Sequence, residues 1–266
     1  MSAEQQDVLL RFGAIVKDEL EKSGQSLVLI TRSGLDLSRF GVRYSHAGLS
    51  LKASRNAPWS VRQLYYACDE RKPRLYDQGM SGFLLGADDP STGYVSVVFL
   101  PREQAAPLEQ AALDDTLVLQ LLGAQYSANA YPFSARYQNC NQWVVELLAA
   151  AWGQPEPGQD LRAQAQAWLR DQGYAPSVFN VSHTLMWLGD FVPWVHSDDH
   201  PPEDLGQLSY RVSMPASIEA FVRATVPGAT RMEFCHIGRR VVIRHGWDAI
   251  AEGCQPGERD RVLTLD

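Results

Sequence analysis

Residues 139–152 read NCNQWVVELLAAAW, and this stretch decides which fold the sequence favours. Asn139 is a residue type preferred at the N-cap of a helix, and Gln142 follows three positions later, as in a variant of the capping box. The apolar residues that follow recur every three or four positions: Trp143, Val144, Leu147, Leu148 and Ala151. The pattern predicts a helix that begins at Cys140 and keeps the Cys140 thiol on its buried stripe.

The chain before this helix carries one helical pattern and several β-type patterns. An amphipathic helix is predicted at residues 8–20, and helical spacing returns at residues 108–122. Between them, short apolar runs predict four strands, at residues 26–31, 42–52, 59–66 and 94–100. Together these patterns predict an α+β fold in which a small antiparallel sheet packs against the Cys140 helix.

The chain after residue 155 is expected to form an extension. The stretch QPEPGQ at 154–159 is the predicted linker, so we expect a core at residues 1–155 and a C-terminal extension at 156–266. Within the extension, helices are predicted at 161–169 and 218–224, and a hairpin that turns at Gly238 joins two strands. These strands are predicted at residues 231–236 and 239–245.

His46 and Cys140 form the strongest chemical pair in the sequence. Strand alternation at 42–52 places His46 on one face with Tyr44 and the small residues Gly48 and Ser50. A thiol reacts as its thiolate, and a helix N-terminus or an imidazolium lowers its ordinary pKa of about 8.5. We therefore expect Cys140 to be a nucleophile and His46 its base. Gln63 on the next predicted strand would orient the His46 ring.

Two segments resemble a known superfamily. The run YSHAGL at 44–49 resembles the His-containing strand of circularly permuted NlpC-like proteins, and NCNQWV at 139–144 resembles the start of their cysteine helix. His46 precedes Cys140 by 94 positions, which is the permuted order. The motif similarity covers residues 26–152, and the chain as a whole is similar to a bacterial family known only as a domain of unknown function.

The resemblance implies a papain-like cleft between helix and sheet. It implies that Cys140 is the nucleophile and His46 the base, and that Tyr126 lines the cleft, with Tyr44 and Asn139 as further substrate-binding residues. The third catalytic residue departs from the family pattern, because many permuted relatives carry glutamate where this chain offers Gln63. The implied reaction is acyl transfer, either on an amide of a cell-wall peptide or on an ester of a lipid or lipoprotein.

Other functions stay open at this stage. The same cleft could bind a peptide or acyl ligand without turning it over. The loop HSDDH at 196–200 holds possible metal ligands, but it lacks a helical or CxxC frame, so we expect a solvated loop, no metal and no cofactor. A formal net charge of -7 without a basic run argues against nucleic acid, and the chain has no apolar stretch long enough to span a bilayer.

Cell location and cysteine pairing follow less directly from the sequence. Envelope substrates would place the protein in the bacterial periplasm, after loss of a leader, and a cytoplasmic location is the alternative. The N-terminal residues predict a helix and show no secretory leader. A disulfide between Cys235 and Cys254 is an alternative in an oxidising compartment, although free buried thiols are the expectation. The oligomeric state is left open.

Overall fold

The structure is a computed structural model that describes residues 1–86, 89–189 and 191–265. Residue contacts divide the chain into two compact units. Unit 1 comprises Met1–Arg62, Asp77–Ala105 and Val226–Asp266, and unit 2 comprises Gln63–Tyr76 and Ala106–Thr225. The units therefore do not divide the chain at the predicted boundary between residues 155 and 156. The last 41 residues of the chain belong to unit 1 because their strands complete its sheet.

The main sheet has eight strands in the order β10-β9-β8-β5-β1-β2-β3-β4, and every pair whose register is described is antiparallel. Its first strands are β1 (Leu27–Arg32), β2 (His46–Leu51), β3 (Ser60–Ala67), β4 (Lys72–Gln78) and β5 (Thr92–Phe99). The C-terminal strands are β8 (Thr230–Ile237), β9 (Arg240–His245) and β10 (Arg261–Thr264). The four predicted strands and the predicted C-terminal hairpin are confirmed, and the fold is α+β with a large antiparallel sheet.

Two features of the sheet differ from the prediction. β2 begins at His46, four residues later than the predicted start at Val42, and a short 3-10 helix (Ser38–Phe40) lies before it. β4 was not predicted, because its sequence KPRLYDQ is charged and contains Pro73. Charges and proline are typical of an edge strand, and β4 is the last strand of the sheet.

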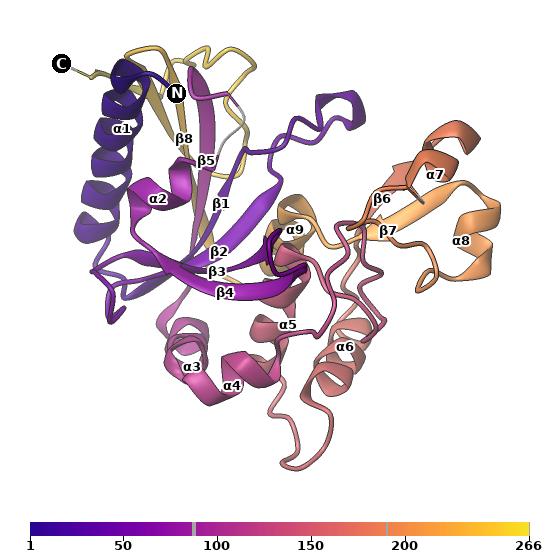
Figure 1. Cartoon of the computed structure of the whole chain (residues 1–266). Helices are drawn as coiled ribbons and strands as arrows, with labels where there is room; N and C mark the ends of the chain where they lie inside the picture. The colour runs from indigo at the N-terminus through magenta and orange to yellow at the C-terminus, as the bar shows by residue number, and fades with distance from the viewer. Residues whose placement is uncertain (87–88, 190, 266) are drawn as a thin grey trace. The chain divides into compact units, whose positions relative to one another are not determined.

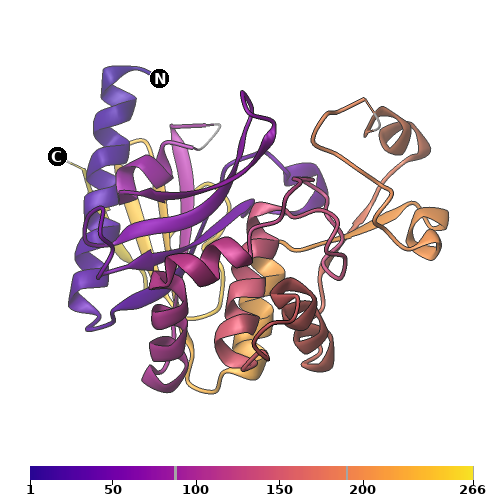
Figure 2. The ribbon, with the colours of Figure 1, turned by 60° about the horizontal axis from the view of Figure 1, so that its bottom comes forward.

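In unit 1, the helices α1 (Ala3–Lys22) and α2 (Met80–Leu84) cover one face of the sheet (Figures 1 and 2). Val28 and Ile30 of β1 belong to the apolar core under these helices. Residues paired directly across two antiparallel strands lie on the same face. Arg32 lies two residues after Ile30 and therefore on the same face of β1, and it pairs with His46. The side chain of His46 thus lies on the face that α1 and α2 cover.

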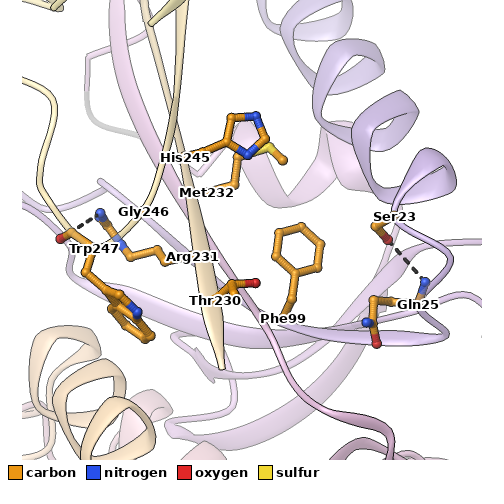
Figure 3. Close-up of a pocket in the computed structure, with 9 residues that line it drawn as sticks. All are labelled: Ser23, Gln25, Phe99, Thr230, Arg231, Met232, His245, Gly246 and Trp247. Atoms are coloured by element: carbon orange, nitrogen blue, oxygen red, sulfur yellow. Dashed lines mark hydrogen bonds between the residues drawn. The ribbon is translucent and has the colours of Figure 1, made fainter. Parts of the chain in front are cut away.

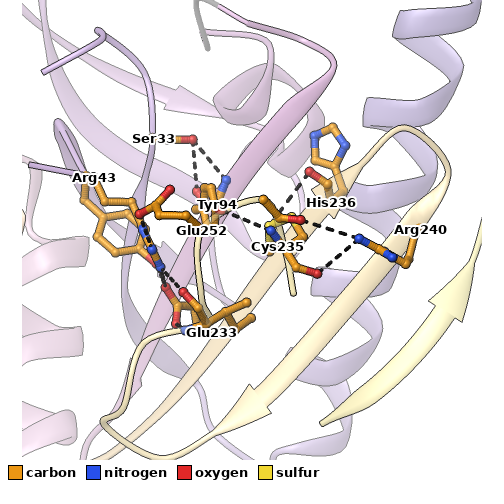
Figure 4. Close-up of a disulfide and its surroundings, with 12 residues drawn as sticks. Ser33, Arg43, Tyr94, Glu233, Cys235, His236, Arg240 and Glu252 are labelled. Carbon is orange, nitrogen blue, oxygen red and sulfur yellow. Dashed lines mark hydrogen bonds and ion pairs between the residues drawn. A yellow bond between two sulfur atoms is a disulfide. The ribbon is translucent and has the colours of Figure 1, made fainter. Parts of the chain in front are cut away.

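A disulfide joins Cys235 of β8 to Cys254, with 5.6 Å between their Cα atoms (Figure 4). The expectation that both would be free buried thiols is therefore wrong. Both cysteines are fully buried in a small cluster with Tyr44 and Tyr94. The backbone N–H of Cys254 donates to the Tyr94 hydroxyl at 3.3 Å. Sequence spacing alone could not distinguish this pair, because β8 brings the two residues together only when the sheet forms.

The helices of unit 2 include α4 (Asp115–Gln120), α5 (Cys140–Trp152), α6 (Leu161–Asp171) and α9 (Pro215–Thr225). The predicted helix at 108–122 is two helices, because α3 (Arg102–Leu113) ends before Asp114 caps α4. The Asp114 carboxylate accepts hydrogen bonds from the N–H groups of Thr116 and Leu117. The predicted linker at 154–159 joins α5 to α6 inside unit 2, so it is a loop between packed helices rather than a boundary between domains.

A smaller substructure of unit 2 follows α6. Its strands β6 (Ser177–Asn180) and β7 (Ser209–Val212) form a two-stranded antiparallel sheet. Between them lie the short helices α7 (His183–Gly189) and α8 (Pro202–Gly206), as Figure 1 shows. No element in this stretch was predicted from the sequence, because its helices span only one or two turns and its apolar residues do not recur with a clear period.

Candidate functional site

Cys140 is the first residue of α5, and Asn139 is its N-cap. The side-chain oxygen of Asn139 accepts a hydrogen bond from the N–H of Gln142 at 2.7 Å, as predicted. The Gln142 amide does not return the bond to Asn139, and it instead donates to Glu146 Oε1 at 3.1 Å and to backbone carbonyls. Cys140 is not part of a disulfide, and 9% of its surface is exposed, which confirms its buried position.

Tyr126 contacts the Cys140 thiol. Its hydroxyl forms a hydrogen bond with Cys140. The pKa of Tyr126 is raised well above its ordinary value, mainly by burial and to a smaller extent by the neighbouring Cys140. The hydroxyl therefore keeps its proton and can donate it to a thiolate. The segment before α5 holds Tyr126 in place, since Ser127 N–H donates to Gln138 O at 3.2 Å and Gln138 N–H donates to Gln125 O at 3.0 Å.

Asn139 links the cap to the rest of unit 2. Its side-chain NH₂ donates to the carbonyl of Ala128 and to that of Ser213, each at 3.3 Å. The residue is 1% exposed. The structure therefore shows Asn139 as a helix cap that fixes the backbone next to Cys140, and the predicted contact with substrate stays a prediction.

A buried ionic network around Glu146 holds the segment before α5 in place. Glu146 of α5 is fully buried and receives two hydrogen bonds from Arg162 of α6, at 2.9 and 3.1 Å. Three amide side chains also donate to the Glu146 carboxylate: Gln138, Gln142 and Gln166. Arg162 in turn donates to the carbonyls of Ala135 and Tyr137. The network ties the segment that carries Tyr126 and Asn139 to two helices.

A row of aromatic side chains leads away from Tyr126. The ring of Tyr66 lies 5.0 Å from that of Tyr126, and the ring of Trp194 lies 6.1 Å from that of Tyr66. The backbone holds the far end, because Ala128 N–H donates to Trp194 O at 2.8 Å. Tyr66 and Trp194 were not identified from the sequence. They lie 60 and 68 positions from Tyr126, and neither position carries a motif that would bring them together.

The other predicted site residues lie in different surroundings. His46 is 7% exposed, and its ring lies 6.0 Å from the ring of Phe83 in α2. Gln63 is fully buried in β3. His46 belongs to unit 1, whereas Gln63 and Cys140 belong to unit 2. The contact of His46 with Cys140 and its contact with Gln63 therefore stay predictions.

Tyr44 has a structural environment in unit 1. Its hydroxyl donates to the carboxylate of Glu233. Glu233 also accepts a hydrogen bond from Arg43 at 3.1 Å (Figure 4). Glu233 is fully buried and accepts a further bond from the N–H of Ile250 at 2.6 Å. Tyr44 thus helps to hold the loop that carries the disulfide, and its predicted role in substrate binding stays a prediction.

The loop at 196–200 is packed rather than solvated, contrary to expectation. His200 Nε2 lies 2.7 Å from the carbonyl oxygen of Asn129, and the Asp199 carboxylate accepts from Tyr131 N–H at 2.8 Å. The N–H of His196 bonds to Ser127 and Asn129. These bonds bury Asp199 and His200 against residues 127–131, and burial raises the pKa of Asp199. Within the described ranges, no three acidic, His or Cys side chains gather in a metal-binding group.

A cavity lies in unit 1. It has a volume of about 440 Å³ and is lined in unit 1 by residues that follow α1 and by residues of β5, β8 and β9 (Figure 3). Its lining includes the apolar side chains of Phe99, Met232 and Trp247 and the exposed residues Thr230 and His245. None of the residues predicted to form the active site lines this cavity.

Comparison with known proteins gives one match. A family described as "Uncharacterized protein conserved in bacteria (DUF2145)" matches residues 19–222. The chain belongs to this family. The expected similarity to a bacterial family of unknown function is thus confirmed, and the family range contains His46, Gln63, Tyr126 and Cys140 but ends before the disulfide. Neither the curated proteins nor the solved structures gave a match. Among the described residues, no helix has both the length and the apolar character needed to cross a bilayer.

Proposed function

We propose that this protein is a cysteine-dependent hydrolase or acyltransferase of the circularly permuted NlpC type, with Cys140 as its nucleophile. The observation that carries the proposal is the position of Cys140. It is a thiol outside any disulfide, in the first turn of α5, next to an Asn139 cap and hydrogen-bonded to the hydroxyl of Tyr126. The positive end of a helix dipole and a hydroxyl donor both stabilise a thiolate over a thiol.

The reaction follows from these groups. The Cys140 thiolate attacks the carbonyl carbon of an amide or ester, and the N–H of Cys140 at the helix N-terminus helps to hold the oxyanion. His46, in its proposed role as base, takes the thiol proton and gives it to the leaving amine or alcohol. Water or another acceptor then attacks the thioester and releases the acyl group. Gln63 would orient the His46 ring without adding a negative charge beside it.

The proposed location is the bacterial cell envelope, where cell-wall peptides and lipoprotein esters occur. The buried Cys235 to Cys254 disulfide supports this location, because structural disulfides persist in oxidising compartments such as the periplasm. Cys140 takes no part in that disulfide and keeps its thiol available for chemistry.

The test measures thiol reactivity and needs no substrate. The protein is labelled with iodoacetamide at pH 6 and at pH 9, and the labelled cysteines are mapped by mass spectrometry. At pH 6 an ordinary thiol is only about 0.3% ionised, given a pKa near 8.5. We expect Cys140 to react faster than Cys68 at pH 6, although Cys68 is exposed and Cys140 is buried. Cys68 is thus an internal control in the same sample.

Two variants separate the contributions to reactivity. His46→Ala removes the proposed base, and Tyr126→Phe removes the hydroxyl donor while keeping the ring. Both should slow the labelling of Cys140 at pH 6 and leave the circular dichroism spectrum unchanged. Slow labelling of Cys140 that is equal with and without His46 would reject the catalytic pair and favour a binding module in which the same cleft holds a peptide or acyl ligand.

A further inference from the structure

Unit 2 exposes a group of large apolar side chains around α7, which we call the aromatic surface. It consists of Leu185, Trp187, Leu188, Phe191 and Trp194. Phe191 is 68% exposed and Trp187 is 60% exposed, and their rings meet edge to face at 5.0 Å. None of the residues described in α7 is buried. Exposed apolar side chains that gather in one place mark an interaction site more often than single ones do.

One residue of the aromatic surface also contacts the candidate site. Trp194 is its last member, and the row of Tyr66 and Tyr126 runs from Trp194 to Cys140. Tyr66 and Tyr126 are both partly exposed, although the Tyr126 hydroxyl beside Cys140 is buried. A ligand that covers the aromatic surface can therefore extend along the row toward the thiol.

The charge of unit 2 restricts the kind of ligand. Its residue ranges contain 8 Lys and Arg against 15 Asp and Glu, which gives a formal net charge of -7, equal to that of the whole chain. Unit 1 contains 16 of each kind and is neutral. Residues 177–212, which include the aromatic surface, hold five acidic residues and a single Arg. Arg211 is paired with Asp204, Arg136 is paired with Asp198, and Asp199 is buried, so the excess negative charge belongs to unit 2 as a whole. Such a field repels anionic lipid headgroups and acidic peptides and attracts cations.

We propose that the aromatic surface binds a basic, apolar polypeptide segment. Apolar side chains of the segment would cover Leu185, Trp187 and Phe191, while its Lys or Arg residues would gain from the net negative charge of unit 2 and from the faces of the aromatic rings. This inference concerns binding and does not depend on catalysis by Cys140. If both proposals hold, the row places the bound segment next to the thiol.

The test uses the full chain and a fluorescently labelled synthetic peptide of Leu and Lys with an apolar face and a basic face. A second peptide carries Glu in place of every Lys. Fluorescence anisotropy should show that the Lys peptide binds at least tenfold more tightly than the Glu peptide. Its affinity should also fall as NaCl is raised, because the attraction is partly electrostatic.

The double variant Trp187→Ala/Phe191→Ala should weaken binding of the Lys peptide by tenfold or more, since aromatic anchors dominate such interfaces. Its fold should be retained because both side chains are exposed. The matched control is Leu119→Ala, which removes a 58% exposed apolar side chain from α4 in the same unit. Equal affinity for both peptides, or a double variant that binds like the control, overturns the proposal. Binding to phosphatidylglycerol vesicles without binding to the Lys peptide also overturns it, in favour of a membrane surface.

Discussion

The buried Glu146 carboxylate offers a sharp test of how unit 2 is held together. We consider Glu146→Gln, which keeps the shape of the side chain and removes its charge. In the wild type, Arg162 donates two hydrogen bonds to Glu146, and the two side chains are 7% and 0% exposed. The variant leaves the Arg162 guanidinium buried without a counter-charge. Removing one partner of a buried ion pair typically costs about 3–5 kcal/mol.

The three glutamine side chains add to this cost. Gln138, Gln142 and Gln166 all donate NH₂ groups to the Glu146 carboxylate. An amide at position 146 has one oxygen, so it cannot accept all the bonds that two carboxylate oxygens accept. We therefore expect the upper half of the 3–5 kcal/mol range. At about 1.4 kcal/mol for each factor of ten, amide exchange through opening of α5 should accelerate by roughly 10³-fold or more.

The assay is hydrogen exchange read by mass spectrometry on peptides from α5 and α6. The control is Asp198→Asn, which breaks the ion pair with Arg136 in the same unit, where both side chains are more than half exposed. Exposed pairs contribute only about 0–1 kcal/mol, so this control should change exchange by less than tenfold. If Glu146→Gln and Asp198→Asn had equal effects, the network would not be what anchors residues 121–138 on the helices.

Two further predictions concern unit 1. Burial lowers the pKa of His236, and this effect is larger than the opposite effects of the Gly238 backbone and the Asp89 carboxylate, which raise it. The free energy of unfolding should therefore fall as pH drops below about 6.5 toward the folded-state pKa. His236→Leu should reduce the difference in stability between pH 7.5 and pH 5 measured by urea unfolding, and an unchanged difference would assign it to other groups. Replacing Cys235 and Cys254 together by Ala should lower the stability by about 3 kcal/mol, given their separation of 19 residues, and a loss below 1 kcal/mol would show that the Glu233 bonds alone hold the loop.

The sequence predicted those parts of the fold that depend on local patterns. The helix from Cys140 follows from the Asn139 cap and the apolar spacing, and both appear in the structure. The hairpin of β8 and β9 follows from two alternating runs around Gly238. β4 was missed because it is an edge strand with polar residues, and the break at Asp114 was missed because the apolar spacing continues across it. Local pattern therefore identified the type of an element better than its ends.

The candidate site was only partly predictable, for a physical reason. Cys140, Asn139 and Tyr126 precede or begin one helix, so a local motif could point to them. Tyr66 and Trp194 join the row through contacts across 60 or more residues, and the disulfide forms only because β8 carries Cys235 to the Cys254 loop. A single sequence shows the residue types but not such long-range partners. The arrangement around His46 is of the same kind, since Phe83 reaches it from α2.

The strand order of the sheet has a consequence for synthesis of the protein. β5 lies between β1 and β8, and it pairs with β8 along eight residues. About 130 positions separate the end of β5 at Phe99 from the start of β8 at Thr230. At the usual 5–20 residues per second, a ribosome needs roughly 7–26 s to make that stretch. During this time the β5 edge of a nascent chain has no native partner, and an open apolar edge can pair with other chains. The protein should therefore depend on chaperones during translation more than a chain of equal length whose neighbouring strands are consecutive.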